Sequence, residues 1–396
     1  MGGNAFDKLA TPRMPFKLYA YMRDRCVAQL ETVYHRVAVP HEAPGKDSHG
    51  DVDILVARPK LDKVNGALVG RLLGASHSKL EGAVTKIYAV PLPPREAWDD
   101  DSDGVDQTKD AYCQVDVHAC SDDDGLDWEM LMCSYGDLMQ IVGKFLRYAG
   151  LTANDKGLYV RVPAIEAAGQ KTRSMVFLSR DRAAVLAFVG LDGAAWERGF
   201  RSQDELFEWC CRMRWAHAGA FEFDVENHND RQRMAKRKAF NDFGHGWMLE
   251  RFESSAYVAS FASREQLREE VLTAALGQFD KYDQYEAKMR EFRNDESEKA
   301  FWTRVDTTIP TTGSDLRLAK RALKRWVAFN GNAPTLRRQA EMELQEQPRW
   351  SSMAATCGPT GEDMVLEWIG LHWQEVYDLE KEREYQEKLA REGRGG

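Results

Sequence analysis

The chain has 396 residues, of which 43% are hydrophobic, and its 11 tryptophans provide enough apolar surface for one large core or several ordinary ones. Its formal net charge of −9 excludes a protein whose whole surface binds nucleic acid, although local basic patches remain compatible with such binding. No apolar run is long enough to span a membrane and the first residues carry no secretory signal, so we expect a cytoplasmic or nuclear protein.

The first third of the sequence alternates between helical and extended patterns. Apolar residues at helical spacing predict a helix from Thr11 to Val33. The elements expected after it are a loop over 45–50, a strand over 51–57, a helix over 64–73, and strands over 84–90 and 112–119. An acidic run over 99–104 separates the last two strands and is too highly charged to be buried.

The rest of the sequence becomes mostly helical. Asp137 is expected to cap a helix over 138–148, and Gly150 to end it in the left-handed conformation. Short strands are expected over 158–162 and 174–178, followed by helices over 181–189, 204–213, 231–252, 264–293, 316–329, 334–345 and 362–391. The pattern indicates an α+β fold with a mixed β-sheet, followed by a mostly helical C-terminal region. The expected domains are an N-terminal helix over 1–34, a sheet domain over 35–178 and a helical domain over 179–396.

Three acids are embedded in apolar strands of the sheet domain. Asp51 and Asp53 are two residues apart, so a strand directs both carboxylates to the same face. Asp116 lies between Val115 and Val117 on a later strand. Two carboxylates about 4 Å apart repel by roughly 4 kcal/mol at an effective dielectric near 20, and a bound divalent cation reverses that repulsion. The three acids therefore predict a metal site.

The sequence around these acids resembles the palm domain of the family X DNA polymerases, which have the nucleotidyltransferase fold and include polymerase β. The resemblance is carried by the run Gly50-Asp51-Val52-Asp53 with its apolar continuation towards Pro59, and by Asp116 about sixty residues later. It continues at Ser134-Tyr135-Gly136-Asp137, which stands where the family has a Thr-Gly-Ser-Asp turn that contacts the nucleotide. The similar region covers roughly residues 30–165.

This resemblance implies a magnesium-dependent nucleotidyltransferase. Asp51, Asp53 and Asp116 would be both catalytic residues and metal ligands, holding two Mg²⁺ ions, or Mn²⁺ in their place. The residues that the resemblance assigns to binding an NTP or dNTP are Lys46, Ser48, Gly50, Tyr135, Gly136 and Asp137. Backbone amides in the turn over 45–50 are further candidates for contacting phosphate oxygens.

The sequence departs from the family pattern just before the acids. The Gly-Ser pair of the family is replaced by Pro40-His41, and its paired arginines are replaced by Ala43-Pro44. Because proline lacks an amide donor, phosphate contacts must come from other groups, with His41 and Lys46 as candidates. The lyase domain and the duplex-binding hairpins of the family have no counterpart in the sequence.

Several other residues have both a functional and a structural interpretation. His118 lies on the same strand face as Asp116 and is expected to be a hydrogen-bonded structural histidine rather than a catalytic one. Tyr135 is a candidate for stacking on a base, with core packing as the alternative. The basic segments 231–238 and 317–326 are candidates for contacting a polynucleotide backbone, or are solvated helix faces.

The function expected from these observations is transfer of nucleotides from an NTP or dNTP to the 3′ hydroxyl of a nucleic acid. The absence of duplex-binding elements favours a terminal or single-stranded acceptor. Two alternatives remain open: nucleotidyl transfer to a protein or small molecule, and an inactive palm that serves as a nucleotide-binding or interaction scaffold.

Overall fold

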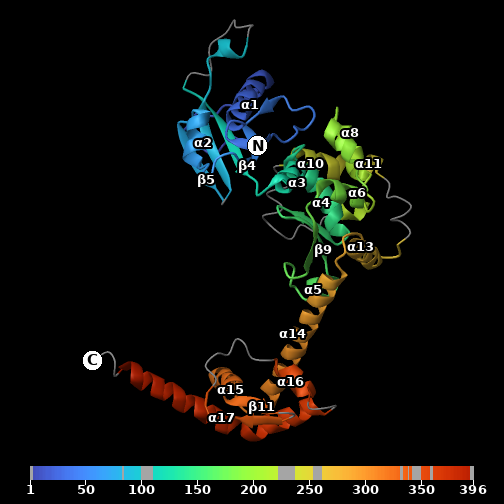
Figure 1. Cartoon of the computed structure of the whole chain (residues 1–396). Coiled ribbons are helices and arrows are strands. Elements are labelled where there is room, and N and C mark those ends of the chain that lie inside the picture. The colour runs from blue at the N-terminus through green and yellow to red at the C-terminus, as the bar shows by residue number, and fades with distance from the viewer. Residues whose placement is uncertain are drawn as a thin grey trace. The chain divides into compact units, whose positions relative to one another are not determined.

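The computed structural model forms two compact units, residues 1–282 and 283–396, which we describe separately (Figure 1). The predicted domain limits at residues 34 and 178 stay a prediction. No helix among the residues described is long and apolar enough to cross a membrane. The described residues are 3–82, 84–99, 110–221, 237–252, 261–330, 333–337, 339–340, 349–356 and 360–392.

A five-stranded sheet forms the centre of the first part of unit 1. Its strand order is β2-β4-β7-β6-β5, in which β4 and β7 are parallel and the other neighbours are antiparallel. The strands are β2 (Tyr34–Ala38), β4 (Asp51–Pro59), β5 (His77–Glu81), β6 (Thr85–Pro91) and β7 (Tyr112–Ala119). The α+β class with a mixed sheet, predicted from the sequence, is confirmed.

One face of this sheet is buried under α1 (Phe16–Leu30) and α2 (Gly66–Leu73) (Figure 1). Val52, Ile54 and Val56 alternate along β4 and pack with Leu18 and Met22 of α1 in one apolar cluster. Burial of a side chain of this size stabilises the fold by about 1.5–3 kcal/mol, so this face fixes the strand register. The acids, at the alternate positions, are thereby directed to the opposite face.

The opposite face is partly covered by residues that precede α1. Phe6 is buried against Ile87 and Ala89 of β6. Met14 and Pro15 form the short strand β1 (Met14–Pro15), which pairs with β3 (Ser48–His49). Because these residues are extended, α1 begins at Phe16 rather than at Thr11, and the expected loop over 45–50 contains a strand instead.

The remainder of unit 1 is mostly helical and includes a three-stranded antiparallel sheet in the order β10-β9-β8. Its strands are β8 (Leu151–Asn154), β9 (Gly157–Arg161) and β10 (Met175–Ser179). Its helices are α3 (Asp123–Cys133), α4 (Leu138–Tyr148), α5 (Pro163–Ala167), α6 (Arg182–Val189), α7 (Gly193–Arg198), α8 (Gln203–Cys211), α10 (Lys238–Asp242), α11 (Met248–Arg251) and α13 (Arg264–Gln278), with a π-helical turn at Phe243–Trp247.

Unit 2 is built from helices and one hairpin around a tryptophan-rich core. Buried Glu380 lies within it and accepts hydrogen bonds from Arg325, Trp326 and Arg383. The elements are α14 (Tyr282–Thr308), α15 (Gly313–Trp326), β11 (Val327–Asn330), β12 (Ala333–Leu336), α16 (Trp350–Thr356) and α17 (Gly361–Glu392).

Three of the helices expected after residue 260 also differ from those in the structure. The single helix expected over 264–293 is two helices, because Asp280 takes a left-handed φ of 52° between α13 and α14. The helix expected over 316–329 ends at Trp326, where β11 begins. The prediction of a helix over 334–345 is wrong at residues 334–336, which belong to strand β12. Residues 341–345 lie outside the described residues.

Candidate active site

The parallel pairing of β4 with β7 brings the three predicted acids together. Asp53 is the register partner of Asp116, and Asp51 is the partner of Gln114. Register partners in neighbouring strands direct their side chains to the same face, so one face carries all three carboxylates. One carboxylate oxygen from each acid lies within 4.8 Å of those of the other two. No other group of three or more acids, histidines or cysteines within the described ranges comes this close.

The electrostatics of the three acids fit a divalent cation. Loss of solvation, followed by repulsion from Asp51 and Glu42, raises the pKa of Asp53 to about 6. Burial, followed by repulsion from Asp53, raises the pKa of Asp116 to about 7. Each raised pKa means that the free site disfavours its own negative charge. Three hard oxygen donors with unfavourable mutual repulsion are the donor set that Mg²⁺ or Mn²⁺ prefers.

Gln114 orients Asp116 from the same strand face. Its side-chain amide donates to both carboxylate oxygens of Asp116, at 3.0 and 3.3 Å. The side-chain oxygen of Gln114 accepts a hydrogen bond from the backbone N–H of Ala5 at 2.9 Å. This contact directs the NH₂ group of the Gln114 amide towards Asp116. Gln114 is buried, so this contact holds the carboxylate in one orientation.

The predicted phosphate-binding residues lie in the segment before β4. Lys46 is paired with Glu42, whose carboxylate lies 2.5 Å from the lysine ammonium. Burial alone would raise the pKa of Glu42, but hydrogen bonds from Lys46 and Tyr19 outweigh burial and lower it. A phosphate that binds Lys46 must therefore compete with Glu42. The carbonyl of Gly50 lies against Gly3, where any side chain on residue 3 would clash with it.

Arg13 is a candidate site residue that the sequence analysis missed. Its guanidinium donates to the Ser48 hydroxyl at 2.8 Å and to the Ser48 carbonyl at 2.5 Å, three residues before Asp51. Arg13 is exposed and forms no ion pair with an acid in the described part of the chain. The pairing of β1 with β3 places it there, and a basic residue before the Met14-Pro15 strand was the only available sequence signal.

The turn between α3 and α4 carries the other predicted nucleotide contacts. Tyr135 is buried and its hydroxyl donates to the Trp196 carbonyl at 2.6 Å, so the ring belongs to the core, as the alternative interpretation had it. Tyr135 and Gly136 both have positive φ, at 61° and 64°. The Asp137 carboxylate forms an ion pair with Arg237 at 2.9 Å and does not cap α4. The turn thus offers backbone groups rather than the Tyr135 ring.

The remaining candidates are engaged in structural contacts. His118 forms a hydrogen bond with the Thr85 hydroxyl at 2.8 Å, as expected for a structural histidine. On α15, Lys320 pairs with Asp306 of α14, and Arg321 pairs with Glu384 of α17, so much of this basic face is neutralised within unit 2. Most of the basic segment 231–238 lies outside the described residues.

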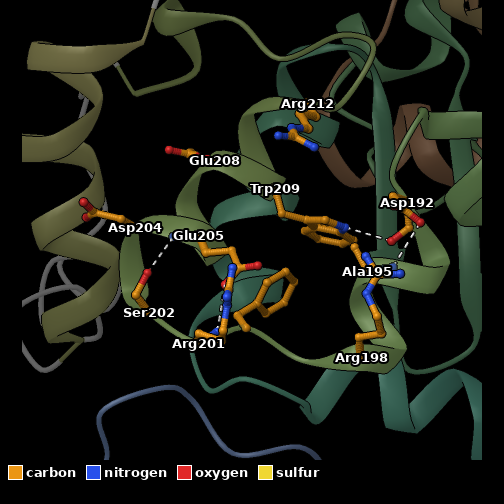
Figure 2. A pocket seen from close by; sticks show the side chains of 11 residues that line it. Asp192, Ala195, Arg198, Arg201, Ser202, Asp204, Glu205, Glu208, Trp209 and Arg212 are labelled. Carbon is orange, nitrogen blue, oxygen red and sulfur yellow. Dashed lines mark hydrogen bonds and ion pairs between the residues drawn. The ribbon is translucent and has the colours of Figure 1, made fainter.

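A separate hollow lies over α7 and α8 in unit 1 and has a volume of about 610 Å³. Figure 2 shows the Trp209 ring at its centre, with the indole N–H donating to the Asp192 carbonyl at 2.9 Å. The Asp192 side chain caps α7, and Asp204 forms an ion pair with Arg251. The three clustered acids do not line this hollow, so we place the candidate chemistry at the acids.

No family model and no curated protein matches the sequence. Among solved structures, the chain is similar to a ternary P/T complex of Leishmania infantum polymerase β, at 17% identity and a TM-score of 0.32 over 46% of this chain and 74% of that one. A ternary gap complex of the same polymerase matches at 17% identity and a TM-score of 0.28, over 40% of this chain and 54% of that one.

Proposed function

We propose that the protein is a magnesium-dependent nucleotidyltransferase that adds nucleotides from an NTP or dNTP to the 3′ hydroxyl of a nucleic acid. The observation that carries the proposal is the convergence of Asp51, Asp53 and Asp116 on one face of two parallel strands, within 4.8 Å of one another. Loss of solvation at Asp53 and Asp116, together with repulsion among the three acids, supports divalent metal binding rather than a purely structural role.

In this proposal Asp51, Asp53 and Asp116 would together hold the Mg²⁺ ions. Gln114 would keep the Asp116 carboxylate in place for this role. When bound, the ions lower the pKa of the attacking hydroxyl and offset charge on the leaving pyrophosphate. Arg13, Ser48 and Lys46 precede β4 and would bind the triphosphate, with Arg13 in contact with Ser48 and Lys46 released from its pair with Glu42. The acceptor would be a single-stranded segment or a terminus.

The test is incubation of the purified chain with labelled NTPs or dNTPs, Mg²⁺ or Mn²⁺, and DNA, RNA or no added polymer. Extension of DNA or RNA supports the proposal. Label on the protein itself or on a small molecule would indicate the alternative acceptor classes. No transfer to any acceptor, with intact metal binding, would favour an inactive palm that serves as a scaffold.

Arg13→Ala should raise KM for the nucleotide by about 10- to 100-fold while lowering kcat much less. A charge-assisted hydrogen bond to phosphate contributes about 1.5–3 kcal/mol, and this contact is present in both the bound substrate and the transition state. Arg13→Lys should recover part of the loss, because lysine keeps the charge without the planar fork. Steady-state kinetics with varied nucleotide provide the measurement. Equal KM values for wild type and Arg13→Ala would remove Arg13 from the site.

Magnesium binding should release protons around neutral pH. The pKa values of Asp53, about 6, and Asp116, about 7, mean that protons occupy the free site near these values and that a cation must displace them. Affinity for Mg²⁺ therefore rises with pH through this range and levels off above about pH 8. Calorimetric titrations in buffers of different ionisation enthalpy measure the protons released. An Mg²⁺ affinity that does not change between about pH 6 and pH 8 would contradict the raised pKa values of Asp53 and Asp116.

A further inference from the structure

His41 joins the segment before β4 to the turn between α3 and α4. Its backbone N–H donates to the Ser134 hydroxyl at 3.0 Å, and its carbonyl accepts from the Tyr135 N–H at 2.6 Å. Ser134 and Tyr135 are both buried. One residue of the loop over 39–46 therefore makes two hydrogen bonds to the turn over 134–137, across more than ninety residues of sequence.

The His41 side chain strengthens the same junction. Its ring stacks on Tyr135, with centroids 5.2 Å apart and an interplanar angle of 10°, and it meets the Trp196 ring edge-on at 5.0 Å. Aromatic pairs of this kind contribute about 0.5–1.5 kcal/mol beyond the area they bury. Burial lowers the pKa of His41, so the ring is neutral near pH 7 and is held in the aromatic cluster instead of binding phosphate.

Glu42, the next residue, connects the loop over 39–46 to helix α1. Glu42 accepts a hydrogen bond from the hydroxyl of Tyr19 on α1 at 2.8 Å and forms the ion pair with Lys46. Residue 41 is thus attached to the turn and residue 42 to the helix that covers the sheet. The loop that leads to Asp51 is anchored at both contacts.

The turn itself has an unusual backbone. Tyr135 has a φ of 61°, a left-handed conformation that costs a non-glycine residue about 1 kcal/mol or more. Such a conformation persists only where surrounding contacts hold it, and the N–H of this residue is the one that donates to His41. A tyrosine can pack in a core without a positive φ, so packing alone does not explain the backbone conformation of Tyr135. The hydrogen bond from its N–H to the His41 carbonyl does explain it.

We propose that His41 is a positioning residue that holds the loop over 39–46 and the turn over 134–137 together before any nucleotide binds. This inference rests on the proposed function for the identity of the ligand. The nucleotide pocket would then be assembled in advance, and binding would need no closing movement between the two segments. A preassembled pocket avoids the ordering free energy that substrate binding otherwise has to supply.

The first test is hydrogen–deuterium exchange of the full chain, followed by mass spectrometry of peptides that contain His41 and Tyr135. Both amides should exchange slowly in the free protein, and adding Mg²⁺ with a non-hydrolysable nucleotide should leave their rates unchanged. Fast exchange in the free protein, or protection that develops only with nucleotide, would overturn the proposal in favour of closure on binding.

The second test separates positioning from general stability. His41→Ala should raise KM for the nucleotide about tenfold or more with a smaller change in kcat, and should speed exchange at Tyr135. Both variants keep the backbone hydrogen bonds of residue 41, but only His41→Phe keeps a flat ring against Tyr135, so it should restore both values. His35→Ala, at an exposed position on β2, is the matched control and should change neither. Equal KM for His41→Ala and wild type, or no recovery in His41→Phe, would overturn the positioning role.

The proposed function and the junction at His41 are tested by different outcomes. If the wild-type chain transfers no nucleotide to any acceptor, the proposed function fails, while slow exchange at both amides still supports the junction at His41. If transfer occurs but the two amides exchange rapidly in the free protein, the proposed function stands and the preassembled pocket does not.

Discussion

Replacing Asp116 with asparagine should lower nucleotide transfer by about a thousandfold or more and, at the same time, make the metal-free protein more stable above pH 7. The proposed function predicts the loss of activity, because the substitution removes one of the three charged oxygen donors that are proposed to hold the metal ions. The asparagine side chain also keeps only one carbonyl oxygen, so Gln114 can no longer donate to two acceptor atoms and the orientation of the side chain is less well fixed.

The expected gain in stability follows from the sign of the pKa shift. The pKa of Asp116 is raised to about 7 in the folded protein, so the folded state binds more protons than the unfolded state between about pH 4 and pH 7. Stability of the metal-free protein therefore falls as pH rises through this window. Asparagine cannot ionise, so the variant escapes this loss by about 1–2 kcal/mol above pH 7, a value reduced by solvent screening of a partly exposed group.

Urea unfolding at about pH 5 and pH 8 without metal, together with incorporation of labelled nucleotide, measures both effects. Asp110→Asn is the matched control, because this aspartate is exposed and its positive φ of 58° suits asparagine equally well. The control should change neither activity nor the pH dependence of stability. Full activity in Asp116→Asn would contradict the assigned role of the acid.

Glu380→Ala should destabilise unit 2 by about 3–5 kcal/mol, the largest effect that we expect outside the acid cluster. The Glu380 side chain is fully buried and accepts from Arg383 at 2.8 and 3.0 Å and from Trp326 at 3.0 Å. Removing it leaves buried Arg325 without this carboxylate and leaves a cavity beside α15. Denaturant unfolding followed by tryptophan fluorescence provides the measurement.

Glu384→Ala is the matched control for this prediction. Glu384 lies one turn further along α17 and pairs with Arg321 at the surface, where an ion pair contributes about 0–1 kcal/mol. If both variants unfold at the same denaturant concentration, Glu380 does not organise the core of unit 2.

Elements with a strong local pattern could be predicted from the sequence. Strand β7 and helix α4 have the bounds expected, because alternating or helical apolar spacing is complete within each segment. The acid cluster also followed from local pattern, since Asp51 and Asp53 share a strand face and Asp116 lies in a second apolar strand. The register that pairs Asp53 with Asp116 could not be predicted, because it depends on how two distant strands align.

Features that depend on contacts between distant segments could not be predicted in this way. Strand β2 exists through its pairing with β4, and β12 through its pairing with β11, and neither has a distinctive pattern of its own. Arg13 contacts Ser48 because β1 pairs with β3. The basic residues of α15 are neutralised by acids on α14 and α17, which spacing along one helix does not reveal.

Titration of the metal-free protein with Mn²⁺, followed by electron paramagnetic resonance, tests metal binding by the three acids. It requires no knowledge of the acceptor or the nucleotide. We expect saturable Mn²⁺ binding by the wild type, at least tenfold weaker binding by Asp51→Asn and by Asp116→Asn, and wild-type binding by Asp110→Asn. Equal Mn²⁺ affinity in all four proteins would contradict a metal site built from the three carboxylates.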